Sequence, residues 1–170
     1  MDSVFEVAEL IRRLGNVKGR IRLQKIVYLM QQKGCPFGED FEYGHYGPFS
    51  RTLALELDAL KLSELIKETP EKTAAGVLYT YEPKPELAEL MCDTPGMHHL
   101  VGEDIDRTLT LLKRENTHVL EVASSRLFLS RNGLSGEKLD QALEKWKPGL
   151  KQYFPGGASL LQKLGLEEHA

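Results

Sequence analysis

The sequence predicts a mainly α-helical protein with one small β-hairpin, in which a winged-helix-like N-terminal lobe precedes a helical C-terminal lobe. Apolar residues recur at helical spacing through most of the chain. Two strand-like segments flank a turn at residues 70–76 that contains proline and glycine. After Pro83 and Pro85 only helical patterns follow. We therefore expect lobes at residues 1–82 and 83–170, packed as one compact unit.

The N-terminal lobe is predicted to hold three helices and the hairpin. A Ser-x-x-Glu capping box at Ser3 begins the first helix, which ends at Gly15. The second helix is expected from about residue 18 to residue 33, with an inward stripe of Leu23, Ile26, Val27 and Met30. Pro48 suits the first turn of the third helix, because its missing N–H would be unpaired there. The third helix and the two strands are expected at 48–61, 63–69 and 77–82.

The C-terminal lobe is predicted to be entirely helical. The segment 118–129 is apolar around most of its circumference, so we expect it at the buried centre of this lobe. Helices are expected at 86–91, 103–114, 118–129, 135–146 and 158–164.

Charge is unevenly distributed along the chain. The 170 residues carry a net charge of −3, yet residues 10–38 contain seven basic residues and no acidic one. A positively charged surface favours an anionic partner. The N-terminus has acidic residues where a signal peptide would be basic, and no apolar run approaches the ~18 residues of a membrane span. We therefore expect a cytoplasmic protein with no membrane contact, and free thiols at Cys35 and Cys92.

The basic residues suggest a surface for nucleic acid. Lys18, Arg22 and Lys25 recur at i, i+4 and i+7, so we expect them together on the outside of the second helix. The third helix carries Glu56 and Asp58 and begins about fourteen residues after the second, whereas a helix-turn-helix uses a turn of about 3 to 4 residues. The prediction is therefore contact with the backbone of duplex DNA rather than reading of its bases. The predicted binding residues are Lys18, Arg20, Arg22, Lys25, Arg51, Lys67 and Lys72.

No pattern in the sequence indicates a reaction centre. His98 and His99 with Cys92 offer too few converging ligands for a structural zinc site. His45 and His118 lack a nucleophile or an acid at an informative spacing. No glycine-rich phosphate loop is present, so we expect no cofactor, no metal and no catalysis.

Three segments carry a resemblance to a known family: LQKIVYL (residues 23–29), YGHYGPFS (43–50) and the leucine-rich helix ending in LSELIKE (62–68). They resemble the YwgA-like proteins of bacteria and archaea, as do ASSRLFLS (123–130) and EKWKPGL (144–150), and more distantly the Panacea-domain, SocA-like antitoxins. The resemblance implies a winged-helix-related domain without known catalysis, which in the antitoxin-like branch binds a protein partner such as a toxin. It also implies a junction between the second and third helices made by Leu23, Gln24, Lys25, Tyr28, Tyr46, Gly47 and Pro48.

Two functions therefore remain open. The leading hypothesis is a non-catalytic cytoplasmic regulator that binds nucleic acid through the second helix. The alternative is a protein-interaction module of the antitoxin or adaptor type. An enzyme would require His45, Tyr28 and an acid to converge in a pocket.

Overall fold

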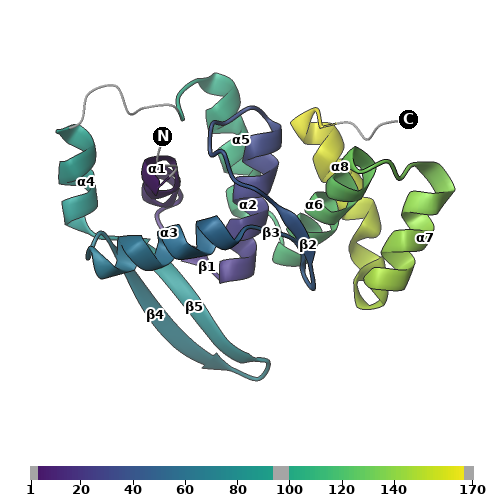
Figure 1. Cartoon of the computed structure of the whole chain (residues 1–170), viewed down its shortest axis with the longest axis horizontal. Coiled ribbons are helices and arrows are strands. Elements are labelled where there is room, and N and C mark those ends of the chain that lie inside the picture. Colours follow the sequence, from purple (N-terminus) through teal and green to yellow (C-terminus); the bar gives the residue numbers. More distant parts are fainter. Residues whose placement is uncertain (1–3, 94–99, 167–170) are drawn as a thin grey trace.

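The computed structural model describes residues 4–93 and 100–166, which form helices and two small antiparallel sheets (Figure 1). The first part of the chain contains α1 (Val4–Leu14), β1 (Val17–Lys18), α2 (Arg20–Gln32), β2 (Glu42–Gly44), β3 (Gly47–Phe49), α3 (Arg51–Leu62), β4 (Ile66–Thr73) and β5 (Gly76–Pro83). The rest contains α4 (Pro85–Cys92), α5 (Glu103–Arg114), α6 (Thr117–Arg131), α7 (Gly136–Trp146), the 3₁₀-helix η1 (Pro148–Tyr153) and α8 (Phe154–Leu164). This order confirms the predicted fold class, mainly α with a small β-hairpin.

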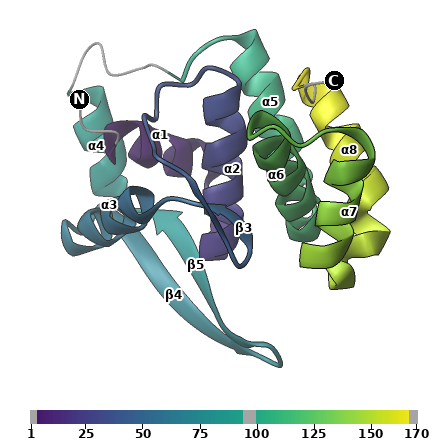
Figure 2. The ribbon, with the colours of Figure 1, turned by 45° about the vertical axis from the view of Figure 1, so that its right-hand side comes forward.

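Strands β4 and β5 form a hairpin that extends away from the helices (Figures 1 and 2). The sheet order is β1-β5-β4, and the short strand β1 was not predicted. The hairpin is also longer than predicted, because Pro70 lies inside β4 opposite Tyr79 instead of in the turn. Proline is tolerated in an edge strand, where its missing N–H is not needed by a second neighbour. β4 is such an edge strand, so Pro70 does not end the pairing.

A second, shorter hairpin places residues 47–49 differently from the prediction. β2 and β3 pair antiparallel, with Tyr43 opposite Pro48. Pro48 therefore belongs to a strand and does not begin the third helix. Ser50 is the N-cap of α3, because its side chain accepts a hydrogen bond from the Leu53 N–H at 3.3 Å.

Helix α6 is buried along most of its length between α2 and α8. Its neighbour α8 begins at Phe154, four residues earlier than predicted, and so includes Gly156 and Gly157. A Cβ at Gly157 would lie only 3.0 Å from the Ala123 backbone nitrogen of α6. The glycine therefore permits a close approach between two helices instead of separating two elements.

One hydrophobic core runs through the described residues of both predicted lobes. It joins Val7 of α1 and Val27 of α2 to Leu120 of α6 and Leu161 of α8. A smaller cluster joins Leu129 of α6 to Leu139 and Leu143 of α7. Within the described part of the chain, no helix is both long and apolar enough to cross a membrane.

Candidate functional site

The seven basic residues predicted to bind nucleic acid are spread over four elements and differ in exposure. Lys18 lies in β1, Arg51 in α3, and Lys67 and Lys72 in β4, and all four are exposed. The remaining residues, Arg20, Arg22 and Lys25, belong to α2, where each contacts other parts of the protein.

Lys25 is not on the outside of α2 as predicted, since only 1% of its surface is exposed. The prediction was wrong because α2 is covered on more than one side, by β3 and by α6. The Lys25 Nζ donates a hydrogen bond to the Pro48 carbonyl oxygen at 2.5 Å. Burial lowers the pKa of Lys25 to about 7, and the nearby Glu121 carboxylate only partly offsets that effect. Lys25 therefore joins α2 to β3 and is not available to a polyanion.

Arg22 is half-buried and binds the C-terminal end of α5. Its guanidinium donates to the carbonyl oxygens of Leu112 and Lys113, both at 2.9 Å, and of Glu115 at 2.7 Å. It also donates to the Thr117 hydroxyl at 3.1 Å. The last carbonyl groups of a helix have no hydrogen-bond donors within the helix. Arg22 supplies those donors at the end of α5. This role replaces the predicted contact with a phosphate.

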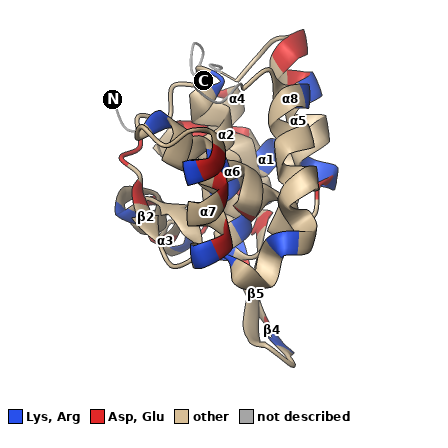
Figure 3. Ribbon diagram, turned by 90° about the vertical axis from the view of Figure 1, so that its right-hand side faces the viewer, with Lys and Arg blue, Asp and Glu red and all other residues tan. Residues whose placement is uncertain are grey.

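Arg20 remains half-exposed, but its charge is matched by acidic neighbours. Its guanidinium lies 2.9 Å from Glu68 and 3.8 Å from Asp58, and 5.3 Å from the centre of the Tyr79 ring. Residues 4–83 contain eleven Lys or Arg and eleven Asp or Glu residues. Lys and Arg are also interspersed with Asp and Glu on the face seen in Figure 3. The charge of Arg20 is therefore balanced within the protein.

The turn between β2 and β3 is held by a buried polar cluster. Lys147, just after α7, donates to the Glu121 carboxylate at 2.6 Å and to the His45 carbonyl oxygen at 2.7 Å. Its side chain and that of Glu121 are both less than a tenth exposed. The Gly47 backbone has φ +86°, and a Cβ there would collide with the Ser125 hydroxyl. The turn is thus fixed against the C-terminal helices as well as against α2.

The residues of the predicted junction surround this turn. The Gln24 amide donates to the Ser50 carbonyl oxygen and accepts from the Ser50 N–H, both at 2.8 Å. Tyr28 is buried with its ring edge-on to Phe41, and Leu23 is buried in the main core. Pro48 is buried, while Tyr46 is half-exposed and lies edge-on to His45. Gln24 therefore fixes the start of α3 relative to α2.

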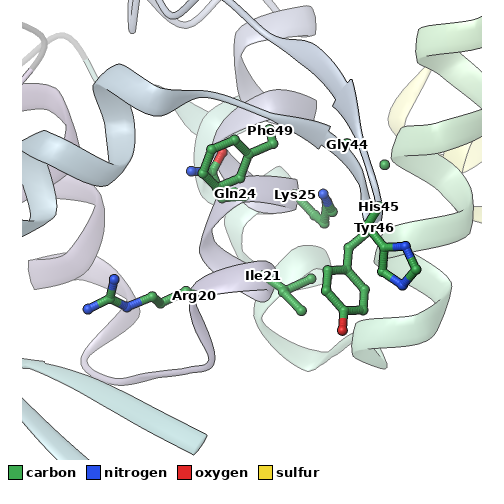
Figure 4. Close-up of a pocket in the computed structure, with 9 residues that line it drawn as sticks. Arg20, Ile21, Gln24, Lys25, Gly44, His45, Tyr46 and Phe49 are labelled. Carbon is green, nitrogen blue, oxygen red and sulfur yellow. The ribbon is translucent and has the colours of Figure 1, made fainter.

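A pocket of about 290 Å³ opens between α2 and this turn (Figure 4). Its walls are mostly apolar, with Lys25 and Gln24 among the residues that reach it from α2. Its lining residues are Arg20, Ile21, Gln24, Lys25, Gly44, His45, Tyr46, Gly47 and Phe49. Such a shape, mostly apolar with few polar groups, is typical of sites for small molecules.

The outward face of α3 is apolar. Leu55 and Leu62 are 69% and 81% exposed, and Ala59 between them is also exposed. Their spacing of i, i+4 and i+7 places the three residues on one face of the helix. Large side chains with such exposure on one face often indicate a contact with another molecule.

The described residues offer little for catalysis or metal binding. His45 reaches the pocket, but Tyr28 is not among the residues that line it. His118 is exposed and stacks on Tyr153 with 4.9 Å between ring centres. Across residues 4–93 and 100–166 no group of three His, Cys, Asp or Glu side chains is placed to hold a metal ion. His98 and His99 lie outside the described residues.

Reasoning from the sequence missed Glu121, Ser125 and Lys147. Glu121 carried a usable signal, because an acid in the mostly apolar segment 118–129 predicts a buried partner of opposite charge. Nothing in the sequence indicated which cation that partner would be, since Lys147 lies 26 residues away.

A comparison with known proteins shows a partial similarity. No family model matches the sequence. The chain is 33% identical over 67 residues to the uncharacterized protein YwgA of Bacillus subtilis strain 168. The matched region is 39% of this chain and 40% of the Bacillus protein, so well under half of either chain is involved. This similarity supports the resemblance to YwgA-like proteins, and it supplies no activity because that protein is itself uncharacterized.

Proposed function

We propose that this protein is a non-catalytic cytoplasmic regulator that acts by binding a protein partner through the outward face of α3. The observation that supports the proposal is the exposed apolar stripe of Leu55, Ala59 and Leu62. In a winged-helix-like domain a helix at this place would enter the major groove and present polar side chains to base edges. An apolar stripe suits the apolar face of a partner helix better than a base pair. The distant resemblance to SocA-like antitoxins, which bind a protein, is consistent with this proposal.

The experiment compares a tagged wild-type chain, purified from its own host, with the double variant Leu55→Glu, Leu62→Glu. A stoichiometric partner should co-purify with the wild type. The double variant should bind that partner about tenfold or more weakly, because two central contacts are lost. Val101→Glu is the matched control, since Val101 is 64% exposed and lies outside α3. Equal retention by the double variant, or no stoichiometric partner at all, would contradict the proposal.

Contact with nucleic acid is a second candidate, supported by exposed Lys18, Lys67 and Lys72 on the sheet that includes the hairpin. Arg22 and Lys25 are not included among the proposed DNA-binding residues, because both bind other parts of the protein. Retention of mixed-sequence DNA duplexes at ~50 mM salt should weaken to a similar degree for every sequence when Lys67 and Lys72 are changed to Ala. No retention by the wild type at that salt concentration would eliminate this candidate.

A further inference from the structure

The buried cluster beneath the β2–β3 turn contains more positive than negative side chains. Lys25 and Lys147 are both buried, and Glu121 is the acid between them. The Glu121 carboxylate is bound by Lys147 at 2.6 Å. Lys25 donates to a neutral carbonyl, and among the described residues no carboxylate is within ion-pair distance of its Nζ. A buried ammonium without its own anion is unfavourable, so this site favours an added negative charge.

The apolar pocket gives such a charge a route to Lys25. The Lys25 side chain reaches from α2 toward the turn between Gln24 and His45, as Figure 4 shows. Gly47 also lines the pocket, and a Cβ on Gly47 would lie 3.8 Å from the Lys25 Nζ. Lys25 is itself among the residues that line the pocket, so a ligand held there would contact its side chain. Ile21, Tyr46 and Phe49 form the more open apolar walls.

We propose that this pocket binds a small monocarboxylic acid, with its carboxylate beside Lys25 and its apolar body between Ile21, Tyr46 and Phe49. The carboxylate gives Lys25 the anion that the fold does not supply, and the walls bury the hydrocarbon part. The site is independent of the α3 stripe, because Leu55, Ala59 and Leu62 do not line it.

The donors in the pocket select a carboxylate over a phosphate. The Gln24 amide uses one N–H and its oxygen in the two hydrogen bonds to Ser50, which leaves at most one N–H, and the Arg20 guanidinium is paired with Glu68. Lys25 is then the main cation, which suits one negative charge. A phosphate has more charge and more acceptor oxygens, and phosphate sites usually provide several donors.

Binding should be linked to a proton. The charged and titratable groups around Lys25 are Glu121 of α6, Lys147 after α7, Tyr43 and His45 of the β2–β3 hairpin, and Arg20 of α2. Lys25 has a pKa of about 7 without ligand, and a carboxylate favours its charged form. Above pH 7 the protein should therefore take up a proton when the ligand binds, and affinity should fall as the pH rises.

Calorimetric titration of the full chain with benzoate, phenylacetate and butanoate tests this proposal, with benzamide as the uncharged match to benzoate. At pH 6.5, benzoate should bind and benzamide should bind about tenfold or more weakly, as expected for loss of one charged hydrogen bond. At pH 8, the heat of benzoate binding should depend on the ionisation enthalpy of the buffer, which reports proton uptake.

Two variants test the two parts of the pocket. Lys25→Met should abolish the preference for benzoate over benzamide and the buffer dependence, while Lys72→Met, at an exposed lysine, should leave both unchanged. Phe49→Ser removes a half-exposed wall residue and should weaken phenylacetate severalfold without changing proton uptake. The Phe49→Ser variant retains Lys25, so it tests the pocket even if the Lys25→Met variant fails to fold. Equal binding of benzoate and benzamide by the wild type, or no binding of any of the three acids at millimolar concentration, would overturn the proposal.

Discussion

The ionisation of Lys25 depends on the fold, because its side chain is buried. Burial brings its pKa to about 7, whereas in the unfolded chain it is near 10.5. Between these values the unfolded chain binds the additional proton, so the free energy of unfolding should rise with pH. Below pH 7 both states are protonated and the cost of burying the charge is fully present.

We therefore expect the wild type to gain stability relative to Lys25→Met between pH 7 and pH 10, with a slope of up to about 1.4 kcal/mol per pH unit. Chemical denaturation of both proteins at several pH values measures this difference. Lys72→Met should show no such pH-dependent difference from the wild type, because Lys72 is exposed. A pH-independent difference between the wild type and Lys25→Met would show that Lys25 keeps its ordinary pKa in the folded protein.

Gly47 allows the β2–β3 turn to lie directly against α6. Gly47→Ala should reduce the free energy of unfolding by about 2 to 4 kcal/mol, from a left-handed backbone cost of about 1 to 2 kcal/mol and the collision with Ser125. Ser125→Ala in the same chain should recover the part due to the collision. Gly34→Ala is the matched control, because Gly34 has φ +96° and no atom within 4 Å of its added Cβ. If Gly34→Ala and Gly47→Ala cost the same, the contact with Ser125 contributes nothing.

At the scale of elements, Arg22 connects α2 to the end of α5. Arg22→Ala should lower the free energy of unfolding by about 2 kcal/mol, because it leaves partly buried carbonyl groups of α5 without their charged donor. Denaturant unfolding measures the loss, and amide hydrogen exchange should increase most between residues 112 and 117. Lys18→Ala, at an exposed position in β1, should change stability by less than about 0.5 kcal/mol. Exchange that increases uniformly over the chain would argue against a local role for Arg22.

Several element boundaries could be read from the sequence and others could not. The stripes of α1 and α5 and the apolar character of α6 are local patterns, and these helices lie where they were predicted. The start of α8 was misplaced because Gly156 and Gly157 signal a break, whereas here they allow contact with Val119 and Val122 of α6. Close approach between distant segments leaves no local pattern that distinguishes it from a turn.

At the scale of the whole molecule, contacts between the predicted lobes are numerous and specific. Trp146 of α7 lies 5.1 Å from Tyr43 of β2, and Phe128 of α6 lies 6.1 Å from Tyr28 of α2, measured between ring centres. The main core also contains residues from both lobes. The two predicted lobes should therefore unfold together.

This expectation can be measured with the single tryptophan. Trp146 fluorescence and far-ultraviolet circular dichroism should give coincident denaturation curves, as for a two-state protein. A fragment of residues 1–82 should not fold by itself, because the face of α2 that packs on α6 would be exposed. Two separate transitions, or a fragment with a cooperative transition of its own, would contradict a single folding unit.

The sequence by itself determined the fold class, the main helices and the presence of the hairpin, because helical periodicity and turn chemistry are local. It also predicted that Lys18, Arg22 and Lys25 share one face of the second helix, which was wrong for Lys18, because Lys18 lies in β1 and α2 begins at Arg20. Only the tertiary structure decided what that face meets: α5 at Arg22, and β3 and α6 around Lys25. A helix with neighbours on several sides has no solvent face that periodicity can identify. The physical reason is that spacing fixes which residues share a face, whereas packing fixes whether that face meets water or protein.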